Sequence, residues 1–313
     1  MNKTLVITHT DLDGAVSYSV LCWYKQARLT VKPVSQADFK TFWRNSIVKN
    51  ISLFDKIYVF DLNVGDIYQE MDFPNVTIVD HHQESVDVAK KLKQAKVFCD
   101  LSTSTSMLLY KTLKGFKQSE FLTKRQKFVL LCADDYEQYT FKIPVTRDLN
   151  YLFWSYQGDR VSKFYEDFKT GFQDFNTQQK NLIAFYRKRL ENTIAELKFF
   201  TADVKIGSKQ YKVASTFADF GINDVAEHTL KVVDSDIVIV INLKTERVSF
   251  RKKPGCDAKL NRLASVLSAG GGHEDAAGGI LNDTFISFSK SFKEYEFQQH
   301  LQNRDRSPTE VLL

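Results

Sequence analysis

The chain has 313 residues, a length at which two domains are the natural expectation. Hydrophobic residues make up 43% of it and charged residues 26%, which supports substantial hydrophobic cores and is ordinary for a soluble protein. The net charge of +5 agrees with a polyanionic substrate, although many proteins without such a partner carry the same mild excess.

The cysteines and the apolar runs exclude further classes of protein. Cys22, Cys99, Cys132 and Cys256 lie far apart with no CxxC spacing, which excludes a dense disulfide framework. The apolar run at residues 5–7 is too short for a signal peptide, and no stretch approaches the length of a membrane span. We therefore expect a cytoplasmic protein with reduced cysteines and no membrane partner.

Short apolar runs alternate with helical patterns in the first part of the chain. Strands are expected at residues 5–8, 30–34, 56–60 and 76–79, and helices near residues 14–26, 36–49, 64–70 and 85–94. This alternation predicts βαβ units and a mostly parallel sheet with helices on both faces. In such sheets, binding sites form at the carboxyl ends of the strands, where His9, Asp61 and Asp80 stand.

The rest of the chain predicts a helical region and then a second α/β unit. Residues 102–170 are expected to be helical, and residues 177–198 to form a long charged helix that connects two domains. A hairpin at 202–206 and 210–215, a helix at 222–231, paired strands at 237–243 and 247–251, a helix at 260–267, a strand near 285–288 and a last helix follow. The predicted class is α/β, with a mostly parallel, helix-flanked sheet in residues 1–176, the linker helix in 177–198 and a smaller α/β domain in 199–313.

His9, Asp11 and Asp13 are the first candidate site residues. Residues i and i+2 of an extended segment point the same way, so these three side chains can converge before Gly14 lets the backbone turn into the next helix. Carboxylates crowded in this way repel one another unless a cation neutralises them, which favours a metal site. The alternative is that Asp11 or Asp13 only caps the helix, since aspartate is a preferred N-cap residue.

Two further groups follow the third and fourth expected strands. Asp61 by itself could close a strand through an Asx turn. The triplet Asp80-His81-His82 is harder to explain structurally, because it combines two adjacent histidines with an aspartate at a strand end. Imidazole and carboxylate together suit Mn, Fe or Zn, and the strand ends therefore predict a metal-dependent phosphoesterase.

Weaker signals occur further along the chain. Asp134 and Asp135 end an apolar helix, where acidic residues are unfavourable for the helix dipole, and this slightly favours a functional role. The segment Gly270-Gly271-Gly272-His273 offers backbone amides to an anion, with a flexible turn as the alternative. Arg251 ends an expected strand and could clamp a phosphate with its planar guanidinium, or be a solvated cation.

Taken together, these motifs resemble the DHH phosphoesterase family with its C-terminal DHH-associated domain, over nearly the whole chain. The segments that carry the resemblance are His9-x-Asp11-x-Asp13-Gly14, Asp61, Asp80-His81-His82, Asp134 and Gly270-Gly271-Gly272-His273. Within the family, the spacing is most similar to the NrnB-type nano-RNases, followed by the RecJ-like exonucleases. The fourth motif departs from the usual single Asp followed by Thr-Gly. Asp134 is the better ligand candidate there, and Asp135 remains possible.

The resemblance implies a site for two divalent cations, usually manganese. His9 and Asp11 would hold one ion, Asp13, His81 and Asp134 the other, and Asp61 would bridge them. The implied catalytic residues are Asp61, His82, which would face the scissile phosphate, and Asp80, which would orient the histidines. The implied substrate-binding residues are Arg251, Gly270, Gly271, Gly272 and His273.

The expected activity is exonucleolytic hydrolysis of short single-stranded RNA or DNA oligonucleotides to nucleoside monophosphates. A homodimer is possible. A RecJ-like exonuclease on longer single-stranded DNA and a phosphodiesterase for cyclic or linear dinucleotides are the alternatives within the same chemistry. Pyrophosphate or polyphosphate cleavage is less favoured, as is a nucleotide-binding protein without activity.

Overall fold

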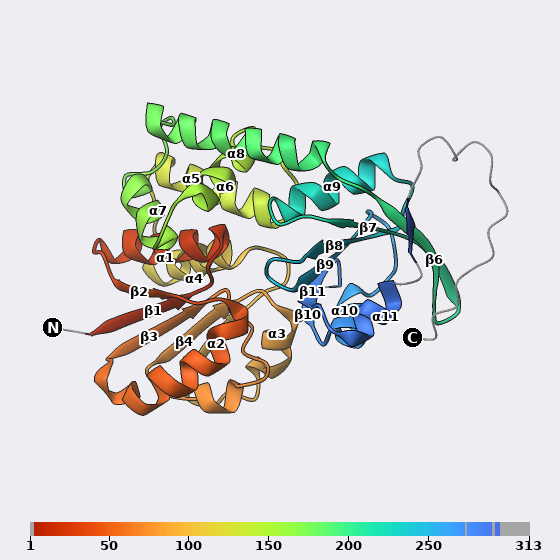
Figure 1. Cartoon of the computed structure of the whole chain (residues 1–313). Helices are drawn as coiled ribbons and strands as arrows, with labels where there is room; N and C mark the ends of the chain where they lie inside the picture. The colour runs from red at the N-terminus through yellow and green to blue at the C-terminus, as the bar shows by residue number, and fades with distance from the viewer. Residues whose placement is uncertain (1–2, 273, 290–291, 295–313) are drawn as a thin grey trace. The chain divides into compact units, whose positions relative to one another are not determined.

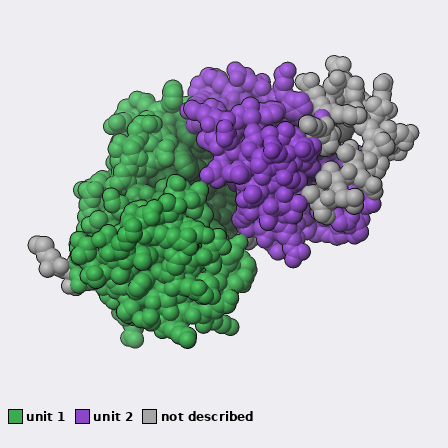
Figure 2. Space-filling model, turned by 60° about the horizontal axis from the view of Figure 1, so that its bottom comes forward, with its two compact units in different colours: residues 1–186 green, residues 187–313 purple. Residues whose placement is uncertain are grey.

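The computed structural model describes residues 3–272, 274–289 and 292–294. The chain divides into two compact units, Met1–Tyr186 and Arg187–Leu313, which Figure 2 colours separately. The division falls inside α8 (Thr177–Ala195), in the region where the sequence predicts the long connecting helix.

The first unit contains a five-stranded, fully parallel sheet with the strand order β2-β1-β3-β4-β5 (Figure 1). Its strands are β1 (Thr4–Thr8), β2 (Thr30–Pro33), β3 (Lys56–Phe60), β4 (Val76–Asp80) and β5 (Lys96–Cys99). The predicted α/β class with a mostly parallel sheet is confirmed. The sequence analysis did not predict β5, a short edge strand without a fully buried residue.

Helices cover both faces of this sheet, because side chains alternate between faces along each strand. On one face, Val6, Phe60 and Val79 pack with the core-facing residues of the helical layer. That layer contains α1 (Leu12–Lys25), α4 (Thr105–Lys117), α5 (Lys124–Glu137), α6 (Thr146–Ser155) and α7 (Arg160–Phe168). On the other face, strand residues such as Ile7 and Val59 pack against α2 (Gln36–Phe42), α3 (Gln83–Ala89) and the irregular turns after α2.

Two predicted helices of the first unit are shorter than expected. The helix predicted over residues 36–49 ends at Phe42 and continues as a π turn (Trp43–Ile47) and a 3-10 segment (Val48–Leu53). The helix predicted over residues 64–70 is reduced to a 3-10 turn at Tyr68–Met71. Before that turn, Asn63 accepts a hydrogen bond from the amide of Gly65, and this Asx turn replaces the first helical turn.

The second unit contains a mostly antiparallel seven-stranded sheet with the order β10-β11-β9-β8-β7-β6-β12. Its strands are β6 (Phe200–Ile206), β7 (Lys209–Phe217), β8 (Ile237–Asn242), β9 (Arg247–Lys252), β10 (Gly271–Gly272), β11 (Ala276–Ile280) and β12 (Lys293–Glu294). Its helices are α9 (Ile222–Val232), α10 (Leu260–Ser268) and α11 (Asp283–Ser289). The predicted hairpin, the paired strands and the helices at 222–231 and 260–267 are confirmed.

The strand predicted near residues 285–288 is wrong, because this segment is helix α11. Phe285 and Phe288 are both buried and stand three residues apart, which puts them on one face of a helix rather than on opposite faces of a strand. The last predicted helix lies outside the described residues. Within the described ranges, no helix combines the length and the apolar character that crossing a membrane requires.

Gly14 lies where the start of α1 packs tightly against the end of β1, and a substitution can test this contact. A Cβ on Gly14 would lie 2.4 Å from the carbonyl oxygen of His9 and 2.9 Å from Oγ1 of Thr8. Gly14→Ala should therefore lower the free energy of unfolding by about 1–3 kcal/mol, as overpacking of a tight contact does. Urea denaturation would measure the change.

The matched control is Gly115→Ala on the exposed side of α4, where a Cβ would meet nothing within 4 Å. This change should raise stability by about 0.5–1 kcal/mol, because alanine loses less backbone entropy than glycine in a helix. Equal stability of Gly14→Ala and the native protein would contradict the close contact.

Candidate metal centre

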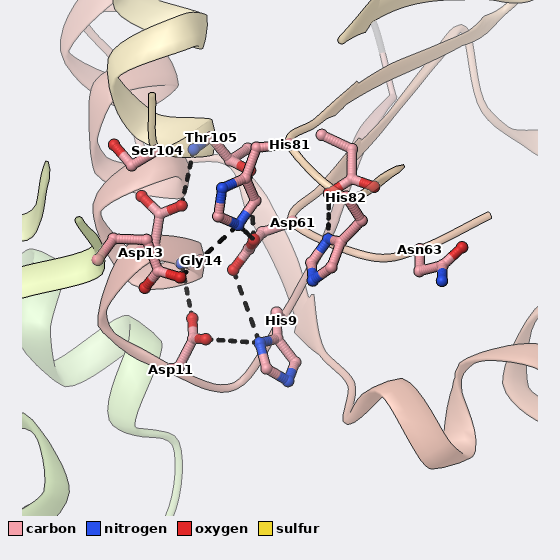
Figure 3. A network of polar contacts seen from close by, with 12 residues as sticks. His9, Asp11, Asp13, Gly14, Asp61, Asn63, His81, His82, Ser104 and Thr105 are labelled. Atoms are coloured by element: carbon pink, nitrogen blue, oxygen red, sulfur yellow. Dashed lines mark hydrogen bonds and ion pairs between the residues drawn. The ribbon is translucent and has the colours of Figure 1, made fainter. Parts of the chain in front are cut away.

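Three neighbouring strands bring the predicted strand-end residues together. β1, β3 and β4 are adjacent and parallel, so their carboxyl ends meet at one edge of the sheet. His9 follows β1, Asp61 follows β3, and Asp80 is the last residue of β4. Figure 3 shows the side chains from these strand ends converging on one another.

Asp11 serves both as a helix cap and as a partner of His9. Its Oδ1 accepts a hydrogen bond from the amide of Gly14 at 2.9 Å, which caps α1. Its Oδ2 lies 2.7 Å from Nδ1 of His9 (Figure 3). The capping alternative and the convergence predicted from the sequence are therefore compatible, since each uses a different oxygen.

Asp13 is buried against the N-terminus of α4. Its two oxygens accept hydrogen bonds from the amides of Thr105 at 2.8 Å and Ser106 at 3.0 Å. Burial, together with the charges of Asp61 and Glu137, raises the pKa of Asp13 well above its usual range. The amides and the dipole at the N-terminus of α4 favour the ionised form of Asp13, whereas burial and the nearby charges oppose it.

Asp61 occupies the middle of the cluster and has a positive φ, which is uncommon for residues other than glycine. Its φ of 58° is in the left-handed region, which aspartate tolerates better than most residues. The carboxylate is buried, with Oδ1 3.4 Å from Nε2 of His81 and Oδ2 3.6 Å from Nδ1 of His9. Burial raises the pKa of Asp61, but hydrogen bonds from His81 and His9 dominate and hold it well below its usual range.

His81 lies between two carboxylates. Its Nε2 faces Asp61 and is also 3.7 Å from Oε1 of Glu137, the last residue of α5. Burial lowers the pKa of His81, but the hydrogen bond and charge of Asp61, with the charges of Glu137 and Asp13, raise it to about 11. Burial and the nearby charge of Asp11 raise the pKa of Glu137 to about 7.

His82 is oriented by Asp80. Nδ1 of His82 lies 2.7 Å from Oδ1 of Asp80, which is fully buried, and the ring of His82 packs edge-on against that of His81 at 4.9 Å between centroids. Burial lowers the pKa of His82, but the charge and hydrogen bond of Asp80 raise it to about 9. Oδ2 of Asp80 has no hydrogen-bond partner within the described part of the chain.

Two sets of side chains have the spacing needed to hold a cation. In one, ligand atoms of His9, Asp11 and Asp61 lie within 4.8 Å of one another. In the other, ligand atoms of Asp61, His81 and His82 do so. The two sets share Asp61. The nitrogen and oxygen donors fit Mn, Fe or Zn, so the residues present match the type of metal that the sequence analysis implies.

Asp134 has other partners. Its Oδ1 accepts hydrogen bonds from the amide of Ser104 at 3.0 Å, from Oγ of Ser104 at 2.7 Å and from Oγ1 of Thr103 at 3.2 Å. It therefore fixes the start of α4, whose N-cap is Ser104. Like Asp13 and Glu137, Asp134 is not a member of the two candidate cation sets found among the described residues.

Asp135 holds the loop that follows α5. Its carboxylate accepts hydrogen bonds from the hydroxyl of Thr140, the amides of Lys142 at 2.9 Å and Ile143 at 3.0 Å, and the hydroxyl of Thr146 at 2.8 Å. Burial opposes this charge, but the four donors lower the pKa of Asp135 to about 2.

Glu137 approaches the cluster, with Oε1 3.7 Å from Nε2 of His81, and the sequence analysis did not single it out. It is three residues after Asp134, so the two side chains are on the same side of α5. That spacing was visible in the sequence. The choice between the two residues depends on how α5 packs against α4, which short-range patterns do not reveal.

The remaining predicted residues belong to the second unit. Arg251 is the penultimate residue of β9. It donates hydrogen bonds to the carbonyl of Phe250, to the carbonyl of Ala277 and, at 2.6 Å, to Oδ1 of Asn223. His273 lies outside the described residues.

The predicted substrate-binding glycines have partly structural roles. Gly271 and Gly272 form β10, which pairs with β11. A Cβ on Gly270 would lie 2.0 Å from the carbonyl oxygen of Gly278, so close packing explains this glycine. A Cβ on Gly271 would meet nothing within 4 Å, and both strand glycines are exposed. Gly271 and Gly272 therefore keep the accessibility that an anion-binding role requires.

Comparison with known proteins identifies the fold. No protein-family profile matches the chain, and no curated protein sequence matches it. Among solved structures, the pGpG-specific phosphodiesterase PggH from Vibrio cholerae is 13% identical with a TM-score of 0.56, over 92% of this chain and 96% of that one. The DHH domain of a member of a family of ribosomal proteins is 11% identical with a TM-score of 0.56, over 96% of this chain and 84% of that one.

A third solved structure, the exonuclease RecJ bound to manganese, is 12% identical with a TM-score of 0.51, over 92% of this chain and 88% of that one. The chain therefore has the two-domain fold of the DHH-domain proteins.

Asp134→Ala tests the structural role of this carboxylate. The change leaves the buried amide of Ser104 without its acceptor and should lower the free energy of unfolding by about 1–3 kcal/mol. Urea denaturation would measure it, with the exposed Asp66→Ala as the matched control. A stability loss no larger than that of the control would contradict the assignment.

Proposed function

We propose that this protein is a metal-dependent phosphodiesterase that hydrolyses short single-stranded oligonucleotides to nucleoside monophosphates. The observation that carries the proposal is the pair of candidate cation sets that share the buried carboxylate of Asp61. A carboxylate shared by both sets would let two cations bind close together, and such pairs promote in-line displacement at phosphorus.

The proposed ligands follow from the distances. His9 and Asp11 would hold one cation with Asp61, and His81 would hold the second with Asp61. Glu137 takes the place first given to Asp134, because its carboxylate is the one that faces His81. Asp13 stays in the proposed set, since a carboxylate has about four lone-pair positions and the amides of α4 use two of them.

When bound, such cations lower the pKa of a coordinated water and neutralise charge on the phosphoryl oxygens. The protein's own residues supply positioning and proton transfer. Asp80 binds Nδ1 of His82, which fixes the ring and leaves Nε2 as the second donor of the protonated imidazole. The charge and hydrogen bond of Asp80 raise the pKa of His82 and so favour a protonated ring, which could donate a hydrogen bond from Nε2 to the leaving oxygen or to a phosphate oxygen.

The second unit would bind the end of the substrate. Arg251 would contact a terminal phosphate with its planar guanidinium, which Asn223 and two backbone carbonyls orient. The amides of Gly271 and Gly272 would add donors beside it.

A dinucleotide phosphodiesterase is the second candidate. The similarity of fold to a pGpG-specific phosphodiesterase over 92% of this chain and 96% of that one favours it. Both candidates require the same cation pair and differ in the length of the substrate, so one substrate series separates them.

The direct test is hydrolysis with Mn²⁺ of labelled RNA and DNA of two to five nucleotides, long single-stranded DNA, cyclic dinucleotides and pyrophosphate. We expect nucleoside monophosphates from the short oligonucleotides. Cleavage of the dinucleotides alone would favour the second candidate. Cleavage of pyrophosphate alone, or of none of these substrates, would refute the proposal.

Asp61→Asn tests the shared ligand. The amide has no negative charge to share between two cations, so hydrolysis should fall by about 100- to 1,000-fold or more. Circular dichroism and the melting temperature should show a folded protein, and the exposed Asp66→Asn should keep full activity. Retained activity in Asp61→Asn would remove Asp61 from the site.

Glu137→Gln and Asp134→Asn together test the choice of the fourth carboxylate. Glu137→Gln should weaken Mn²⁺ binding by about 10-fold or more, as loss of a residue that supports a metal does. Asp134→Asn should leave Mn²⁺ affinity unchanged, because that carboxylate binds the start of α4. Isothermal titration of the metal-free variants would measure both, and the reverse pattern would restore Asp134 as the ligand.

A further inference from the structure

We propose that a cluster of four lysines on the helical layer of the first unit is a docking surface for the phosphate backbone of single-stranded nucleic acid. The lysine cluster consists of Lys25, Lys114, Lys117 and Lys127. Its charge is a property of the fold, whereas the choice of a nucleic acid among polyanions rests on the proposed function. The surface adds a second contact for strands that are longer than a dinucleotide.

Most of the cluster comes from the most basic segment of the chain. Residues 111–127 contain six lysine or arginine residues and one acidic residue, Glu120. The excess of positive charge in this segment equals the net charge of +5 that the whole chain carries, so the rest of the chain is neutral on balance. Charge of one sign that is concentrated on one part of a surface attracts polyanions more strongly than the same charge spread over the molecule.

Two of the lysines share one aromatic ring. Lys114 in α4 and Lys127 in α5 each place the ammonium group 5.7 Å from the centre of the Tyr110 ring. At this distance the ring attracts a cation electrostatically. Tyr110 is itself buried, so its ring supports the two charges and is not open to a stacking base. The pair is therefore suited to phosphates.

Ring contacts join the other two lysines to this pair. The ring of Phe121 lies 5.6 Å from that of Tyr110 and 5.2 Å from that of Tyr24. The ammonium group of Lys117 is 6.0 Å from the centre of the Phe121 ring, and that of Lys25 is 5.6 Å from the centre of the Tyr24 ring. Four cations from α1, α4 and α5 are thus held over three contacting rings, in the layer that covers one face of the parallel sheet (Figure 1).

One carboxylate accompanies these four cations. Oε2 of Glu120 lies 3.4 Å from Nζ of Lys114 and 3.6 Å from Nζ of Lys127. The same carboxylate also accepts hydrogen bonds from a tyrosine hydroxyl and from two backbone amides. Within the described part of the chain, Lys25 and Lys117 have no ion pair. Like charges held close together repel one another, and a ligand with several negative charges relieves this repulsion.

The lysine cluster presents charge without an apolar anchor. The side chains of Lys114 and Lys127 are 45% and 43% exposed, and the other two lysines are also exposed. The three rings beneath them are buried or half-buried. A lipid surface is held by basic and apolar groups together, whereas phosphate contacts alone bind a nucleic acid strand irrespective of its sequence. The cluster therefore favours a nucleic acid.

The helices fix the separation between the lysine cluster and the candidate metal centre. α4 begins at that centre, where the amide of Thr105 binds a carboxylate, and Lys114 is nine residues further along the helix, or roughly 13 Å. α5 ends there at Glu137, ten residues after Lys127, or roughly 15 Å. A stacked strand rises about 3.4 Å per nucleotide. A dinucleotide at the metal centre is therefore too short to reach the lysines, and strands of several more nucleotides are long enough.

The double variant Lys25→Gln with Lys117→Gln tests the surface with little risk to the fold, because neither lysine has an ion pair to lose within the described residues. Its affinity for a labelled single-stranded RNA of about 12 nucleotides, measured by fluorescence anisotropy in EDTA and about 50 mM KCl, should fall by about 3- to 10-fold. The melting temperature should stay within about 2 °C of the native value, as for exposed lysines without partners.

The charge-matched control is the double variant Lys40→Gln with Lys49→Gln. Both lysines are exposed and belong to the elements that cover the other face of the sheet. Removing the same charge there should change the RNA affinity by less than about 2-fold. Equal affinities of the two double variants would overturn the docking surface, because the effect would then follow net charge and not position.

The salt dependence tests whether the lysines contact phosphates. The logarithm of the affinity for a single strand falls with the logarithm of the salt concentration by about 0.7 for each neutralised phosphate, so removing two contacts should reduce this slope by about 1.4. Lys114→Gln with Lys127→Gln should give the same reduction, and polyuridine and polyadenine strands should behave alike. An unchanged slope in both cluster variants would overturn the proposal.

Strand length and two other polyanions complete the test. With Mn²⁺, the cluster variants should hydrolyse a dinucleotide at the native kcat/KM and lose activity only on the longer strand. An equal loss on the dinucleotide would overturn the surface, because it would place the effect at the metal centre. Binding of phosphatidylserine vesicles or polyglutamate that depends on the cluster, with unchanged affinity for RNA, would overturn the choice of nucleic acid.

The measurement in EDTA separates this surface from the proposed function. No hydrolysis occurs without the metal, so a lower RNA affinity of the cluster variants than of the control would support the surface even if no oligonucleotide were ever cleaved. Cleavage of oligonucleotides by a protein whose RNA affinity does not depend on the lysine cluster would refute the surface and leave the proposed function intact.

Discussion

The candidate metal centre is organised around one buried charge, the carboxylate of Asp61. An ionised carboxylate removed from water is costly unless donors or cations surround it. His9 and His81 approach its two oxygens from the neighbouring strands, and Oγ1 of Thr105 lies 3.2 Å from Oδ1. The parallel order of β1, β3 and β4 makes this possible, because it brings three strand ends to one edge of the sheet. The first turns of α1 and α4 then supply amides to the next carboxylates, Asp11 and Asp13.

Three acidic residues at the end of α5 have three different sets of contacts. Successive residues of a helix are rotated by about 100°, so Asp135 faces other surroundings than Asp134. Glu137 is on the same side as Asp134, about one turn further along the helix. Asp134 binds the start of α4, Asp135 binds the loop that follows, and Glu137 faces His81. Acidic residues at a helix C-terminus are unfavourable because of the helix dipole. Hydrogen-bond donors compensate for this at Asp134 and Asp135, and in the proposed function a cation compensates for it at Glu137.

Local patterns in the sequence are enough to predict the parallel sheet and the strand-end residues, because each depends on a few neighbouring positions. Apolar runs mark β1, β3 and β4, and the residues that follow them must lie at the same edge. The contacts at the end of α5 depend on how two separate helices pack, and the pattern alone could not show that Asp134 binds the start of α4 while Glu137 faces His81. The strand wrongly predicted in place of α11 has a similar cause. The spacing of Phe285 and Phe288 indicates a helix only when it is known that both side chains are buried.

Most positive φ angles of the described residues have a local explanation, and the one at Asp61 does not. Among the described residues, seven other than glycine have positive φ. Gln26, Gln118 and Ala269 end helices, where this conformation is ordinary, and Glu246 lies in the turn between β8 and β9. Tyr139 also ends a helix, because it follows the C-cap Gln138 of α5 and the amide of Thr140 bonds back to the carbonyl of Asp135. Asp61 and Phe141 remain. Strain that local structure does not require tends to concentrate where function requires it. Its presence at Asp61, the carboxylate that the two candidate cation sets share, agrees with the proposed role of this residue.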